Sequence, residues 1–123
     1  MGRPSKLTPE VQRKLVAATR AGVFLTASAP FVGVSRPTVR SWIRRGEAAL
    51  ARVDAGEPPD PAEEPYAEFV RLMMQAKAYA NVADMAVITH AAKTDPYWAM
   101  RRYRLRHPER FRAGVSLHDT GVR

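Results

Sequence analysis

Two observations in the sequence predict an all-α fold. The first is a typical helix start, in which a capping residue is followed within two positions by proline, at Thr8, Ser35 and Asp95. The second is the segment 66–93, which contains neither glycine nor proline and in which apolar residues recur every three or four positions. With one further short helix after Gly22, these signals predict five helices.

The charge of the chain indicates the kind of partner it binds. Its 123 residues carry a formal net charge of +8, so we expect the partner to be a polyanion. Residues 1–50 hold nine Lys or Arg against two acids, residues 51–70 hold one against six, and residues 71–123 hold ten against four. Two basic segments therefore flank an acidic link.

The composition also indicates the cellular compartment in which we expect the protein to work. Cysteine is absent, which excludes disulfides and thiolate metal sites and favours an intracellular protein. The N-terminus has no apolar leader segment, and no run approaches the roughly 20 apolar residues that span a bilayer. We therefore expect a soluble protein of the cytoplasm that has no membrane partner.

The first fifty residues predict three helices in close succession. The first runs from its cap, Thr8, to Gly22, which ends it. A second, shorter helix is expected over residues 27–32, with Thr26 as its cap. Ser35 caps a third helix, whose first turn contains a proline that needs no hydrogen-bond donor there.

Four residues at fixed offsets match a helix-turn-helix motif. This motif requires a small residue where the second helix crosses the first, and a glycine four positions later at the turn. Ala29 and Gly33 supply this pair, and Val39 and Trp42 occupy the two apolar positions expected six and nine residues after the glycine. Pro30 departs from the usual pattern, which leaves the start of the first motif helix open.

The third helix is expected to present arginines outward while Val39 and Trp42 point into the core. A helix in the DNA major groove needs donors for phosphates and base edges on its outer face. The alternative is a solvated surface, but such a surface normally mixes signs, and one acid, Glu47, falls between residues 11 and 50. The segment 2–6 either lies in the minor groove or is a disordered basic tail. The candidate DNA-binding residues are Arg3, Lys6, Ser35, Arg36, Thr38, Arg40, Ser41, Arg44 and Arg45.

The second half of the chain is expected to assemble copies of the protein. Residues 55–65 hold four prolines and four acids, so they form a stiff, solvated linker. The long helix that follows carries a seam with coiled-coil spacing. Its residues, which we assign to oligomerisation, are Phe69, Met73, Ala76, Ala80, Ala83 and Val87. The alternative is a monomeric hairpin in which this helix packs only on the last one.

The predicted domains follow from these segments. They are a DNA-binding domain over 1–54, the linker over 55–65, a helical oligomerisation domain over 66–112 and a flexible tail over 113–123. The last helix begins at the Asp95 cap and is stopped by Pro108. It carries a second basic cluster beside three aromatic residues, and this cluster contacts either DNA or the acidic linker of a neighbouring subunit. The cluster consists of Arg101, Arg102, Arg104, Arg106 and Arg110.

Catalysis is not expected. The acids that could serve a nuclease, such as Asp54 and Asp60, lie in the linker or directly before it, where no scaffold is expected to hold them for metal binding or acid–base work. The chain has no phosphate-binding glycine loop, and its three histidines are scattered without ligand spacing. We therefore expect no metal and no cofactor.

The order of parts resembles the small terminase subunits of tailed bacteriophages. The resemblance rests on four stretches, which are GRPSKLTPEV, VSRPTVRSWIRRGE, the acidic link before PYAEFVRLMMQAKA, and DPYWAMRRYRLRHPERF. It implies a non-catalytic, ring-forming protein of the host cytoplasm that recognises the packaging site and passes DNA to the large terminase, which holds the ATPase and the nuclease.

Carried onto this chain, the resemblance also implies roles for particular residues. The recognition-helix contacts would be Arg36, Thr38, Arg40, Ser41 and Arg44, the ring interface would be residues 69–87, and the tail would dock the large subunit. A transcriptional regulator or a transposase-type DNA-binding module would share the first fifty residues. A structural protein that coats nucleic acid is a third possibility, and it would bind every duplex equally.

Overall fold

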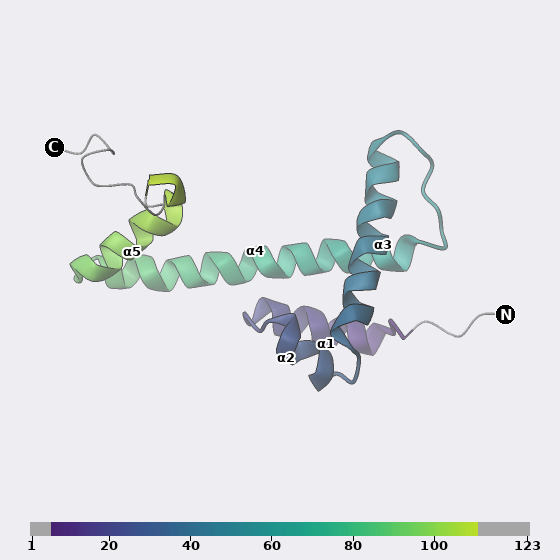
Figure 1. Cartoon of the computed structure of the whole chain (residues 1–123), viewed down its shortest axis with the longest axis horizontal. Coiled ribbons are helices and arrows are strands. Elements are labelled where there is room, and N and C mark those ends of the chain that lie inside the picture. The colour runs from purple at the N-terminus through teal and green to yellow at the C-terminus, as the bar shows by residue number, and fades with distance from the viewer. Residues whose placement is uncertain (1–5, 111–123) are drawn as a thin grey trace. The chain divides into compact units, whose positions relative to one another are not determined.

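A computed structural model describes residues 6–110 of the chain, and within this range it is helical with no strand (Figure 1). The N-terminal arm with Arg3 and the tail 113–123 lie outside the described residues. In chain order the elements are α1 (Pro9–Arg20), α2 (Leu25–Phe31), α3 (Arg36–Asp54), α4 (Glu64–Ala92), α5 (Pro96–Arg106) and the 3₁₀ helix η1 (Pro108–Arg110).

Three of the four predicted N-caps are confirmed. Thr8 Oγ1 accepts a hydrogen bond of 3.2 Å from the Val11 N–H, and Ser35 Oγ accepts one of 3.3 Å from the Thr38 N–H. Asp95 Oδ1 accepts one of 2.9 Å from the backbone N–H two residues further on. Each bond satisfies a donor that the first turn of a helix leaves without a partner.

Two predicted helix starts are displaced by two residues. α2 begins at Leu25 and its N-cap is Phe24, which makes no side-chain capping bond, so Thr26 lies inside the helix. α4 begins at Glu64, within the predicted linker. Both helices start earlier because packing against neighbouring helices stabilises turns that have no local capping signal.

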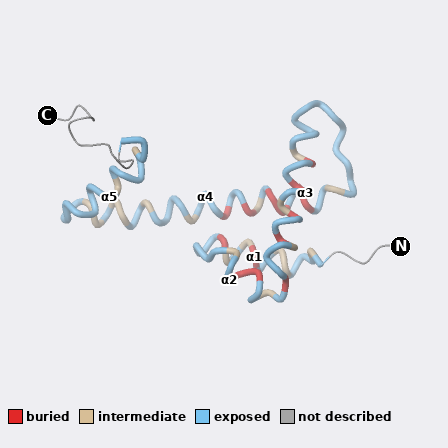
Figure 2. Tube along the Cα trace, in the orientation of Figure 1, coloured by how far each residue is buried: buried red, intermediate tan, exposed pale blue. Residues whose placement is uncertain are grey.

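The core lies where α1, α2, α3 and the first turns of α4 meet (Figure 2). Trp42 of α3 and Phe69 of α4 pack edge to face, with ring centroids 6.0 Å apart. Thr19 of α1 donates a hydrogen bond of 3.5 Å to the Met73 sulfur. The buried cluster consists of Leu15, Ala29, Val34, Val39, Trp42, Tyr66, Phe69 and Met73.

Gly46 allows α3 to cross close to α4. A Cβ at this position would come within 2.7 Å of the Tyr66 carbonyl carbon and would also overlap the Val70 side chain. Glycine is therefore needed here for space, and α3 continues through it to Asp54. Figure 1 shows the two helices crossing, with the segment between them looping back from the end of α3 to the start of α4.

The chain divides into two compact units within α4, at residues 81 and 82. This differs from the sequence prediction, which placed the boundary at the linker 55–65. The physical reason for this division is that Tyr66, Phe69 and Met73 at the beginning of α4 belong to the same buried cluster as the core residues of α1, α2 and α3.

The predicted oligomerisation seam is divided between the two units. Phe69, Met73 and Ala76 are buried in the core of their own chain, so they are not available to a second copy. In the described part of the second unit, residues 82–110, no residue is buried. Val82 is 70% exposed and Val87 71% exposed.

We expect Gly46→Ala to lower the free energy of unfolding by about 1 to 3 kcal/mol, because the added methyl group overfills the crossing of α3 and α4. Urea denaturation followed by circular dichroism measures the change. The control is Ala48→Gly at an exposed position of the same helix, which should cost about 1 kcal/mol through helix propensity alone. A Gly46→Ala chain more stable than the original would contradict the close crossing.

Candidate nucleic-acid interface

The four residues of the predicted motif lie in α2, in α3 and in the turn that joins them. α2 and α3 are joined by residues 32–35, and Gly33 adopts a positive φ of 86°, which favours glycine. The Val34 N–H donates to the Ala29 carbonyl at 3.0 Å, which closes the turn. Ala29, Val39 and Trp42 are buried.

Three arginines form one row on the outer face of α3. Arg36, Arg40 and Arg44 are spaced four residues apart, so consecutive members are about 6 Å apart along the helix axis. All three are exposed, and they lie opposite the buried residues Val39 and Trp42. None of the ion pairs found between residues 6 and 110 involves them. We call Arg36, Arg40 and Arg44 the arginine row.

Two further predicted site residues form the start of α3. Ser35 Oγ and Thr38 Oγ1 share a hydrogen bond of 2.7 Å, and Ser35 also caps the helix. Their hydroxyl groups are therefore partly engaged within the chain. Ser41 is exposed beside the arginine row, and Lys6 is exposed before α1.

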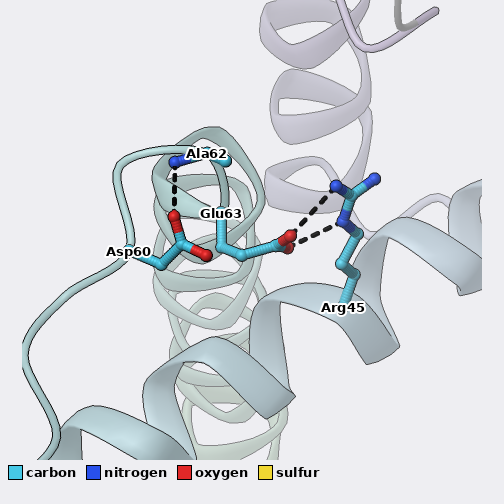
Figure 3. Close-up of polar contacts among 4 residues, drawn as sticks. All are labelled: Arg45, Asp60, Ala62 and Glu63. Atoms are coloured by element: carbon cyan, nitrogen blue, oxygen red, sulfur yellow. Dashed lines mark hydrogen bonds and ion pairs between the residues drawn. The ribbon is translucent and has the colours of Figure 1, made fainter. Parts of the chain in front are cut away.

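Arg45, which the sequence analysis assigned to DNA, is engaged within its own chain. Its Nε and one terminal nitrogen donate to the Glu63 carboxylate at 2.7 and 3.0 Å (Figure 3). The guanidinium also lies 4.1 Å from the centroid of the Tyr66 ring. Arg45 therefore holds the start of α4 against α3 and does not belong to the arginine row.

This ion pair shifts both ionisation equilibria. The hydrogen bond from Arg45 is the main cause that lowers the pKa of Glu63 below its ordinary value of 4.5. The same bond raises the pKa of Arg45. Asp60 accepts a hydrogen bond of 2.9 Å from the Ala62 N–H, which shapes the turn that brings Glu63 to α3 (Figure 3).

Two features of this region were not predicted from the sequence. One is the pairing of Arg45 with Glu63, whose separation of eighteen residues gives no periodic signal. The other is a pair of exposed aromatic residues at the two ends of α2, the N-cap Phe24 at 81% and Phe31 at 85%. Their spacing of seven residues, which places two side chains on the same side of a helix, could have revealed the second feature.

Residues 6–110 contain no group of three or more acidic or histidine side chains that could hold a metal ion. None of the helices in this range is both long and apolar enough to cross a bilayer. Comparisons with models of protein families, with curated proteins and with solved structures find no match to the chain.

We expect the Arg45–Glu63 pair to stabilise the fold in a pH-dependent way. Because the pKa of Glu63 is lowered on folding, the pair contributes stability above pH 4.5, and the contribution is lost as the pH falls through the lowered pKa. The difference in unfolding free energy between the original chain and Glu63→Gln should therefore be constant near neutral pH and shrink in acid.

Urea denaturation at a series of pH values measures this difference. Glu57→Gln, which removes an exposed carboxylate from the same linker, is the control for the loss of one charge. A difference that grows on acidification would contradict the assignment of Glu63 as the carboxylate with the lowered pKa.

Proposed function

We propose that this chain is a DNA-binding small terminase subunit of a tailed bacteriophage, which recognises the packaging site of the viral genome. The arginine row on α3 is the observation that carries the proposal. It combines a buried face that fixes the helix with an exposed cationic face, and a helix that reads DNA needs both. α2 and α3 act as a helix-turn-helix, with α3 in the major groove.

The arginine row suits base recognition as well as phosphate contact. An arginine presents five N–H donors in a planar fork, which matches the two acceptors at the guanine edge in the major groove. Arg40, in the middle of the row, is the candidate for a base contact. The flanking Arg36 and Arg44, together with Lys6, are candidates for phosphate contacts.

The second part of the proposal is that several copies assemble through the distal half of α4. Val82 and Val87 are exposed in the single chain, and a helix with apolar residues on several sides is normally covered on several sides. Ala80, Ala83 and Val87 form the remaining part of the seam, and the small alanines allow close approach of a second helix. A ring of copies presents several α3 helices to DNA.

The remaining roles follow from the resemblance to small terminases. The protein works in the host cytoplasm without catalysis of its own and without a cofactor. It delivers DNA to the large terminase and regulates its ATPase and nuclease. Residues 113–123, outside the described range, are the candidate dock for that subunit.

We expect Arg40→Ala to weaken binding to the specific site by about 1 to 3 kcal/mol and to relax the preference at one base position. Selection of bound sequences from a random duplex pool measures both effects. Arg52→Ala, at an exposed position near the end of the same helix, is the matched control and should leave the preference unchanged. An equal loss on all sequences would make Arg40 a phosphate contact.

We expect Val87→Glu to dissociate the assembly while each chain stays folded, because the charge would be desolvated in the interface but is solvated in the single chain. Light scattering measures the mass, and circular dichroism measures the helicity. Ala78→Glu, at an exposed position on the opposite side of α4, is the control. A mass of more than two copies for the original chain favours a ring over a dimeric transcriptional regulator. An unchanged mass for Val87→Glu would contradict the seam.

A further inference from the structure

α5 combines a high positive charge with exposed aromatic residues. It contains four arginines and no acid over eleven residues, and none of these eleven residues is buried. Tyr97 is 59% exposed and stacks edge to face on Trp98, with centroids 5.1 Å apart. Arg101 lies 6.0 Å from the Tyr97 ring centroid.

The arginines and the apolar residues of α5 are interleaved. Residues four apart form rows along a helix. One row contains Tyr97, Arg101 and Leu105, and the next contains Trp98, then two arginines. A helix that lies on a membrane surface separates its charged and apolar faces, and this one does not. Arginine and tyrosine side chains are instead among those that contact the phosphates and sugars of duplex DNA.

The nearest acids in the sequence are already engaged. Asp95 caps α5, and Glu109 lies 3.7 Å from the His107 imidazole. None of the ion pairs found between residues 6 and 110 involves Arg101 or Arg106.

The acidic linker of a second copy is also a poor match for α5. Glu63 is bound to Arg45, and Glu64 is bound to Arg71 at 3.0 Å, a contact that raises the pKa of Arg71. Asp60 is engaged in its own turn. Most of the acidic linker is therefore committed within its own chain, and the charge of α5 is better matched by a continuous line of phosphates.

We propose that α5 is a second DNA-binding surface, which contacts the phosphodiester backbone of duplex DNA without reading its sequence. Arg101 and Arg106 contact phosphates, and Tyr97 and Trp98 pack against the sugar–phosphate chain. This surface lies in the second unit, so it binds DNA independently of the arginine row. Contacts at this surface increase the affinity for DNA and its dependence on salt, and α3 alone recognises the DNA sequence.

The test uses the full chain and a duplex of random sequence. Arg101→Gln/Arg106→Gln should weaken binding on the order of ten-fold near 0.1 M salt, and it should reduce the slope of log affinity against log salt by about 2, since each phosphate contact contributes roughly 0.9. Arg101→Lys/Arg106→Lys keeps both charges and should retain most of the affinity.

Lys77→Gln/Lys93→Gln is the matched control, because it removes two exposed charges outside α5. It should change the affinity by less than the α5 substitutions. The same α5 substitutions made in an Arg40→Ala chain should give the same fold-loss, because the two surfaces act independently. A failure of the α3 proposal, seen as an Arg40→Ala chain with unaltered sequence preference, leaves this comparison intact.

Three results would overturn the inference. One is an unchanged affinity and salt slope for the Gln variant. Another is a loss of assembled mass in that variant at the same protein concentration, which would assign the arginines to acids of a second copy. The third is binding to phosphatidylglycerol vesicles that falls with the Gln substitutions while duplex binding does not.

Discussion

The fold depends on the packing of α4 beneath α3. Trp42 and Phe69 meet edge to face in the core, and Gly46 lets the two helix backbones approach one another. Tyr66, Phe69 and Met73 of α4 belong to the same buried cluster as the core residues of α1, α2 and α3. The domain that carries the arginine row and the first half of α4 therefore form a single folded unit.

The polar contacts around this crossing orient α3 and contribute little stability. The Arg45–Glu63 pair and the stacking of Arg20 on Tyr79, 3.9 Å from its ring centroid, lie at the surface, where solvent screens such contacts. Both join a helix of the N-terminal domain to α4 or to its approach. They restrict the direction in which α4 leaves the first three helices.

In contrast to the first unit, the described part of the second unit has no buried core. Its described residues, 82–110, include exposed valines and aromatic rings and no buried side chain. Full burial of such a side chain contributes about 1.5 to 3 kcal/mol. The exposed side chains of α5 and of the distal half of α4 therefore contribute little hydrophobic free energy to folding. The proposed assembly would cover the exposed valines of α4.

The sequence by itself determined the helices, because caps and helix breakers act locally: Thr8, Ser35 and Asp95 each bond to a backbone N–H within three residues. It also determined which side of α3 is buried, since helical periodicity separates Val39 and Trp42 from the arginine row. Only the tertiary structure decided what contacts Phe69, Met73 and Arg45. Heptad spacing predicts that Phe69 and Met73 are buried, but it does not tell whether a neighbouring copy or the chain's own core buries them. The positive charge of Arg45 likewise does not tell whether its partner is a phosphate or Glu63. Both outcomes depend on contacts between residues far apart in the chain, which local patterns do not encode.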